Sequence, residues 1–191
     1  DLDISGKEII EGSGTQNITS SDTKKVKFTT DFQVLSSAYY YNGPYSNTGS
    51  VKPKANNKTT YTIKWSITNT TSPVNDVYVR TSLPINVRMV GSPTPENADI
   101  YRDGQTGDII WKVGKVERGL GFNNNPLTAY FQVELLPSIS DVGIVPILIK
   151  ETKIYGIDSL TGKKIENTWQ PLTTKLYNDQ NYSETNQYVG E

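Results

Sequence analysis

Two residue types are missing from this chain of 191 residues, which has no cysteine and no histidine. Without histidine, the chain cannot form a Ser-His-Asp triad, a Cys-His pair or a site with a histidine general base. Without cysteine, it has no disulfide, no thiolate zinc site and no iron–sulfur cluster. Because the sequence also lacks any supporting catalytic motif, we expect a protein that is not an enzyme and that holds no metal or cofactor.

Net charge and long apolar runs are also scarce. The 19 basic and 20 acidic side chains leave a net charge of -1, which gives no electrostatic basis for binding nucleic acid. No apolar run is long enough to span a bilayer, so we expect no membrane insertion. The lack of cysteine is compatible with the cytosol and with the exterior of a bacterium that does not use disulfides.

The chain is rich in threonine, asparagine and tyrosine. Threonine favours strands, whereas asparagine favours turns because it tolerates a left-handed backbone and bonds its own main chain. The 12 tyrosines, 3 tryptophans and 4 phenylalanines can anchor a hydrophobic core. This composition predicts an all-β fold with many loops.

The clearest strand lies at Thr59–Thr70, where the sequence reads TTYTIKWSITNT. Its apolar residues Tyr61, Ile63, Trp65 and Ile67 occupy alternate positions, and a period of two places them on one buried face of a strand. Related patterns predict strands at Asp76–Leu83, Asn86–Val90, Thr128–Leu136, Ile144–Tyr155, Lys163–Trp169 and Leu172–Leu176, and a hairpin over Asp99–Val113.

The first third of the chain is organised differently. We expect strands at Ile4–Glu11 and Lys24–Tyr41, joined by a Gly/Ser/Thr-rich loop over Gly12–Asp22. A polar connector follows at Asn42–Asn57, and the polar tail Tyr177–Glu191 is expected to be mobile. No segment has the periodicity of a helix, and turn signals about every 8–12 residues indicate a β-sandwich.

Four segments then follow one another in an order that is informative: TTYTIKWSITNT, NDVYVRTSLP, DIIWKVGKVERGLGF and FQVELLPSISDVG. With the preceding AYYYNGP segment, this series resembles the immunoglobulin-like "conserved repeat" domains, a domain of unknown function. Such domains occur in tandem in bacterial and archaeal surface proteins, including large surface proteins of candidate-phylum bacteria. The resemblance covers about Phe32 to Leu176.

The resemblance implies an immunoglobulin-like β-sandwich over residues 32–176. Additional strands within residues 1–31 would be N-terminal extras or the end of a preceding repeat, and residues 177–191 would form the tail. The expected core residues are Tyr61, Ile63, Trp65, Val77, Val79, Trp111, Phe131, Val133 and Ile149.

Two groups of residues are candidates for a site. Related surface domains carry a Lys–Asn isopeptide bond promoted by a buried acid, and here the resemblance offers only Lys27, Glu134 and Asn167 on candidate strands. The other candidate is a ligand site at Tyr39, Tyr40, Tyr41 and Tyr45, whose rings would stack on sugars or on a neighbour if they are exposed. The competing interpretation places these rings over the core, as amphipathic tyrosines often lie.

The loops Asp103–Asp108 and Asp158–Gly162 carry too few carboxylates for calcium, so both are interpreted as turns. The expected function is a non-catalytic stalk repeat of an extracellular, bacterial cell-surface protein, whose partners are neighbouring repeats or subunits. One alternative is a fibre subunit in which the segment Lys24–Tyr41 pairs with the open sheet edge of a neighbour. Another is a carbohydrate-binding module that recognises surface glycans through the exposed tyrosines.

Overall fold

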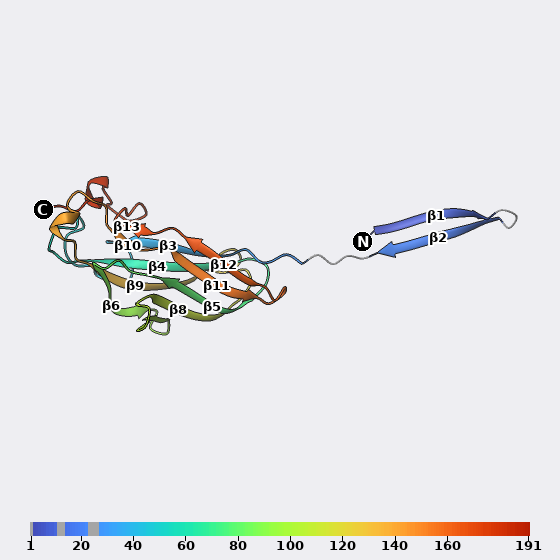
Figure 1. Cartoon of the computed structure of the whole chain (residues 1–191), viewed down its shortest axis with the longest axis horizontal. Coiled ribbons are helices and arrows are strands. Elements are labelled where there is room, and N and C mark those ends of the chain that lie inside the picture. The colour runs from blue at the N-terminus through green and yellow to red at the C-terminus, as the bar shows by residue number, and fades with distance from the viewer. Residues whose placement is uncertain (1, 11–13, 23–26) are drawn as a thin grey trace.

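The computed structural model describes residues 2–10, 14–22 and 27–191, and in these ranges the chain is almost entirely β-structure (Figure 1). Two short 3-10 helices, η1 (Ile139–Asp141) and η2 (Glu184–Gln187), lie in the second half of the chain. The strands are β1 (Leu2–Ile10), β2 (Gly14–Asp22), β3 (Phe32–Tyr39), β4 (Thr59–Asn69), β5 (Val74–Thr81), β6 (Val87–Thr94), β7 (Asp99–Arg102), β8 (Ile109–Val116), β9 (Leu127–Leu135), β10 (Ile147–Ile149), β11 (Thr152–Asp158), β12 (Lys164–Trp169) and β13 (Leu172–Thr173). No helix in the described ranges has the length and apolar character needed to cross a membrane.

Two antiparallel sheets pack face to face as a sandwich. One has the strand order β3-β4-β9-β6 and the other has the order β12-β11-β5-β8-β7. An immunoglobulin domain has the strand order A-B-E-D in one sheet and G-F-C, extended by C′, in the other. The order of strands here reproduces that arrangement, so the predicted immunoglobulin-like sandwich is confirmed. One difference is that β6, in the D position, precedes the β7–β8 hairpin along the chain.

The core between the sheets is formed by the residues that the alternating apolar pattern of the sequence predicts. All nine of the expected core residues are buried, and Tyr61, Ile63, Trp65, Val79, Phe131, Val133 and Ile149 have no exposed surface. Trp65 stacks on Trp111 from the opposite sheet at a centroid distance of 6.4 Å and meets the edge of Phe131 at 4.8 Å. These aromatic contacts join the two sheets at the centre of the sandwich.

The polar connector after β3 covers the outer face of β4, which is why even the polar positions of β4 are mostly buried. The backbone N–H of Thr48 donates to the hydroxyl of Thr60 at 2.7 Å. Asn47 donates to the hydroxyl of Thr62 at 2.9 Å and accepts a hydrogen bond from Gln132 at 2.9 Å. Threonine therefore suits these positions because its hydroxyl satisfies the buried polar groups that a covered strand presents.

Several expected boundaries were wrong. The loop predicted at Gly12–Asp22 contains strand β2, which pairs with β1 in a separate two-stranded sheet. The long strand predicted at Ile144–Tyr155 is divided into β10, which pairs with β13, and β11, which pairs with β5 and β12, and the hydroxyl of Thr81 contacts the carbonyls of Lys150 and Glu151 between them. Of the strand predicted at Lys24–Tyr41, β3 comprises Phe32–Tyr39, and residues 24–26 lie outside the described residues.

The C-terminal tail, which we expected to be mobile, instead folds against the sandwich. Val189 is buried, and its N–H donates to the carbonyl of Ile144 at 3.0 Å. Gly190 donates to the carbonyl of Pro53 at 2.8 Å and accepts from Ala55 at 2.9 Å. The polar tail is held by backbone hydrogen bonds that its composition does not reveal.

Candidate functional site

The most elaborate polar site lies at the end of the sandwich where residues 27–31 approach β3, here called the proximal end. Asp158, at the end of β11, has no exposed surface. Its Oδ2 accepts from the backbone N–H of Thr30 at 3.0 Å and from the hydroxyl of Ser72 at 2.7 Å. Its Oδ1 accepts from the N–H groups of Leu160 and Thr161 at 2.9 and 2.8 Å. One carboxylate therefore joins the start of β3, the β4–β5 loop and the β11–β12 turn.

The charge state of Asp158 follows from these contacts. Burial by itself favours the protonated form, but the hydrogen bonds from Ser72, Thr30 and Thr161 outweigh it and hold the pKa of Asp158 well below its usual range. The buried group is thus an ionised acceptor surrounded by donors, which is the condition under which a buried charge is tolerated.

A second set of hydrogen bonds extends this network around Thr30. Its hydroxyl donates to Oδ1 of Asn69 at 2.7 Å and accepts from the N–H of Thr71 at 2.9 Å. The Asn69 amide in turn donates to the carbonyls of Ser72 and Glu117 at 2.8 and 3.0 Å. Each side chain of the network therefore bonds to a segment other than its own, and the proximal end is fixed as a unit.

The opposite end of β3 is fastened by another aspartate. Asp179, from the C-terminal tail and almost fully buried, accepts three backbone N–H groups that follow β3. Its Oδ2 accepts from Tyr40 at 2.5 Å and from Tyr41 at 2.8 Å, and its Oδ1 accepts from Asn42 at 2.9 Å. We call the pair Asp158 and Asp179 the β3 clamp, since together they hold both ends of the edge strand of the four-stranded sheet.

The tyrosine cluster lies at the end of β3 and in the segment that follows it, and two of its hydroxyls are engaged within the fold. The hydroxyl of Tyr40 donates to the carbonyl of Gly49 at 2.6 Å, and its ring lies against the core ring of Tyr61. The hydroxyl of Tyr45 contacts the carbonyls of Ser92 and Tyr130 at 2.8 and 3.0 Å. Tyr39 and Tyr40 are half-buried and Tyr41 is exposed. Tyr40 and Tyr45 are thus engaged within the fold through their hydroxyls, whereas the ring of Tyr41 stays exposed.

The isopeptide candidates are not brought together. The Lys27 amine donates to the carbonyl of Leu160 at 3.2 Å, and the Asn167 amide donates to the carbonyl of Phe32 at 3.4 Å. Glu134 lies on β9 in the other sheet, where a hydrogen bond from Arg88 lowers its pKa, with a further contribution from Lys58. An acid that promotes an isopeptide bond needs a raised pKa. Glu134 therefore has neither the pKa nor the position that this role requires.

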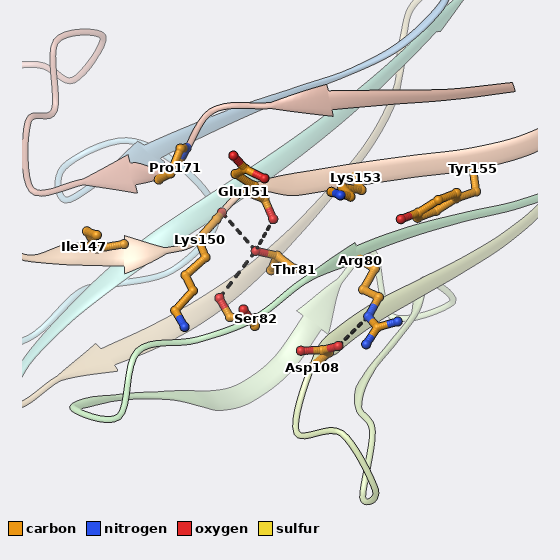
Figure 2. Close-up of a pocket in the computed structure, with 10 residues that line it drawn as sticks. All are labelled: Arg80, Thr81, Ser82, Asp108, Ile147, Lys150, Glu151, Lys153, Tyr155 and Pro171. Atoms are coloured by element: carbon orange, nitrogen blue, oxygen red, sulfur yellow. Dashed lines mark hydrogen bonds and ion pairs between the residues drawn. The ribbon is translucent and has the colours of Figure 1, made fainter.

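An open pocket of about 620 Å³ lies on the outer face of the five-stranded sheet (Figure 2). Arg80 pairs with Asp108 on one side of it, while Lys150, Glu151 and Lys153 line the other. Thr81 donates to the carbonyls of Lys150 and Glu151 at 3.0 and 3.1 Å, so its hydroxyl is engaged in the fold. The pocket offers charged groups for binding and no activated nucleophile.

A neighbouring pocket of about 470 Å³ contains the most exposed aromatic pair on this face. Tyr78 and Tyr155 are cross-strand neighbours that stack at a centroid distance of 4.8 Å. Asp76 lines the same pocket with a left-handed backbone (φ 52°) at a bulge in β5. Within the ranges that the structure describes, no group of three or more acidic residues is placed to hold a metal ion.

Comparisons with known proteins do not assign the chain to a family. No protein-family model matches it, and a search of curated proteins gives no match. Among solved structures, it is similar to a variant of BcpA, the major pilin subunit of Bacillus cereus, with 11% identity and a TM-score of 0.47 over 89% of this chain and 47% of the pilin. The chain thus spans about half the length of that protein.

Two further structures show weaker similarity. The full-length major pilin SpaD from Corynebacterium diphtheriae has 13% identity and a TM-score of 0.40, over 74% of this chain and 35% of that protein. An exo-β-N-acetylglucosaminidase from Vibrio harveyi, in complex with N-acetylglucosamine, has 7% identity and a TM-score of 0.38, over 71% of this chain and 17% of that enzyme. Scores this low support no conclusion about the present chain, whose fold is assigned from its own strand order.

Proposed function

We propose that the chain is a non-catalytic structural module of an extracellular, cell-surface protein, and that it carries tension from one end of its sandwich to the other. The observation that supports this most directly is the path of the chain. Residues 27–31 lie at the proximal end, and the last residues lie at the opposite, distal end, beside Pro53 and Lys54 (Figure 1).

The separation of the two ends follows from the register of β4. The end of this strand at Asn69 bonds Thr30 at the proximal end, and its start at Thr59 adjoins the connector that pairs with Gly190. At about 3.3 Å per residue, the 11 residues of β4 span about 36 Å. Segments joined to the two ends of such a module are held apart by about the length of the sandwich.

The geometry of β3 suits a module under tension. β3 pairs antiparallel with β4 from Phe32 opposite Asn69 to Tyr39 opposite Thr62. Tension applied through residues 27–31 acts along β3, so the backbone hydrogen bonds of this ladder are sheared together rather than broken one at a time. The β3 clamp adds charge-assisted hydrogen bonds at both ends of the same strand.

Single-molecule pulling through the two ends of the sandwich tests the proposal. The Asp158→Ala variant is expected to unfold at a clearly lower force than the wild type, because the proximal attachment of β3 is lost. Asp103→Ala is the matched control, since the Asp103 carboxylate is partly exposed and accepts hydrogen bonds from Thr106 within its own turn. Equal unfolding forces for the wild type and Asp158→Ala would contradict the proposal.

The fibre alternative depends on what pairs with the first strands. β3 pairs within the chain and is fastened at both ends, which disfavours its donation to a neighbour. The β1–β2 hairpin, by contrast, forms a sheet of its own and is not part of either sandwich sheet. A solution mass near 21.2 kDa would favour the single module, and polymers that dissolve when residues 1–26 are removed would favour the fibre.

The carbohydrate alternative is better supported by a different pair of aromatic side chains, Tyr78 and Tyr155. Tyr40 and Tyr45 are engaged through their hydroxyls, whereas Tyr78 and Tyr155 line an accessible pocket with Glu166 and Lys164. Binding to a glycan array that disappears in Tyr155→Ala but persists in Tyr41→Ala would support a sugar site on this face. Absence of binding to any polysaccharide would contradict the carbohydrate alternative.

A further inference from the structure

The turn after β3 contains a chemically reactive pair of residues. Asn42–Gly43 is the one asparagine–glycine pair in the sequence. In any chain, the main-chain nitrogen that follows an asparagine can attack the side-chain amide of that asparagine and close a five-membered imide ring. Glycine favours this reaction, because it has no Cβ to hinder the approach of its nitrogen. The pair therefore combines the side chain and the neighbour that this reaction requires.

The fold explains the glycine of the pair. Gly43 has a φ of 112°, a left-handed backbone in which residues with a Cβ are strained. A Cβ built on Gly43 would also lie 2.8 Å from Cγ2 of Thr62, on β4. The conformation and the close contact with β4 both require glycine at this position.

The fold does not explain the asparagine in the same way. Asparagine is common in turns because it tolerates a left-handed backbone and because its side chain bonds the main chain nearby. Asn42 does neither. In the described ranges, the residues other than glycine that have a left-handed backbone are Asn56, Asp76 and Asn181. The hydrogen bond that Asn42 makes there, to Asp179, uses its main-chain N–H and leaves its side-chain amide free.

The attacking nitrogen is also unrestrained. The N–H groups of Tyr40, Tyr41 and Asn42 all donate to Asp179, which is the distal half of the β3 clamp. The next N–H, that of Gly43, donates to no acceptor among the described residues. Asn42 is half-buried and Gly43 is exposed, so water reaches the pair. The clamp thus ends one residue before the nitrogen that would react.

We propose that Asn42 is a site of spontaneous deamidation whose product loosens the distal half of the β3 clamp. The nitrogen of Gly43 attacks Cγ of Asn42 and loses its proton, and the side-chain amide leaves as ammonia, which produces a cyclic imide. Water then opens the imide. Addition of water at Cγ gives aspartate with an ordinary main chain, and addition at the main-chain carbonyl gives isoaspartate, in which the main chain runs through Cβ and Cγ.

Each product acts against Asp179. The N–H of Asn42 lies 2.9 Å from Oδ1 of Asp179, so a carboxylate on the same residue adds a second negative charge close to the first. Isoaspartate also adds a methylene carbon to the main chain between that N–H and Gly43, whose position is fixed by the contact with Thr62. The distal attachment of β3 is therefore weakened as the protein ages, whereas the Asp158 network is unaffected. This inference does not depend on the proposed mechanical role.

Incubation of the whole chain in neutral buffer, followed by digestion and mass spectrometry of the peptides, tests the chemistry. We expect Asn42 to be converted to aspartate and isoaspartate while Asn97, an exposed asparagine followed by alanine, stays intact. Asn42→Gln is the matched control, because its longer side chain has to close a less favourable six-membered ring. If Asn42 stays intact over a period in which the free peptide of residues 39–45 is converted, the proposal is wrong.

Hydrogen exchange tests the consequence for the clamp. Asn42→Asp reproduces one product, so the amides of Tyr40 and Tyr41 should exchange several-fold faster in this variant than in Asn42→Gln, while those of β4 stay protected. Equal exchange in the two variants would overturn the proposed loosening. If Asn42→Asp does not fold, the aged wild type, separated from fresh protein by its additional negative charge, provides the same comparison.

Discussion

The two ends of β3 are fastened by the same residue type but in different ways. Asp158 has no exposed surface and receives hydrogen bonds from three separate segments. Asp179 retains some exposure and receives three successive N–H groups from a single segment. The proximal aspartate thus determines how several loops meet, whereas the distal aspartate determines where one turn ends and how the tail is attached.

This difference indicates which end of β3 contributes more to the stability of the sandwich. If Asp158 is removed, buried donors in two segments, at Thr30 and Ser72, lose their acceptor and water cannot replace it. If Asp179 is removed, the three N–H groups lie near the surface, where water can partly satisfy them. The proximal end should therefore govern global stability, and the distal end should govern local opening.

The largest effect is expected for Asp158→Ala. It leaves the N–H of Thr30 and the hydroxyl of Ser72 without a buried acceptor, so we expect the free energy of unfolding to fall by about 3 kcal/mol or more. Urea denaturation followed by tryptophan fluorescence measures this, since Trp65 and Trp111 lie in the core. A loss below about 1 kcal/mol would show that the network is dispensable.

The next effect concerns pH. The folded-state pKa of Asp158 is lowered below that of the unfolded chain, so its contribution is present in full above the unfolded pKa of about 3.9 and is lost as the pH falls toward the folded pKa. Wild-type stability should therefore decrease between about pH 5 and pH 2, and Asp158→Asn should lose less over the same range. Parallel pH profiles would contradict the assigned charge state.

A smaller effect is expected for Asp179→Ala. We expect a loss of about 1–2 kcal/mol, since near-surface donors are partly hydrated in the variant. Hydrogen exchange gives a more specific reading: the amides of Tyr40, Tyr41 and Asn42 should lose protection while those of β4 keep it. Uniform loss of protection across the sandwich would mean that the distal end is not an independent unit.

The smallest effect is the coupling between the two ends. The eight residues of β3 separate them by about 26 Å, at about 3.3 Å per residue. At this separation the losses of Asp158→Ala and Asp179→Ala should add to within about 0.5 kcal/mol in the double variant. A larger deviation, measured by the double-mutant cycle, would show that β3 detaches as one unit.

The sandwich could be predicted well from the sequence because the pattern that marks each strand lies within the strand itself. The alternation through Tyr61, Ile63 and Trp65 marks a half-buried strand whatever its partners are, and all of these residues lie in the core. The division of Ile144–Tyr155 could not be predicted, since it depends on pairing with other parts of the chain, β13 for one half and β5 for the other. The apolar composition of Ile144–Tyr155 is compatible with two short strands as well as with one long strand.

The candidate site was predicted poorly for the same reason. Asp158 stands in a segment that has the composition of a turn, and two of its partners, Leu160 and Thr161, are those of a turn. The contacts that make it important come from Thr30 and Ser72, which lie 128 and 86 residues away in sequence. The tyrosine cluster is unusual in sequence, although the hydroxyls of Tyr40 and Tyr45 are engaged within the fold.

The β3 clamp has a consequence for the order in which the chain acquires its structure. The strand that opens the sandwich is fastened by residues that lie 128 and 139 positions later, so neither attachment exists until the chain has been made as far as those residues. β3 can pair with β4 earlier, because β4 lies closer in sequence, but it remains a loosely held edge until Asp158 and Asp179 arrive. Contacts of such long sequence separation slow folding, and they make the arrival of Asp179 the event that fastens the second end of β3.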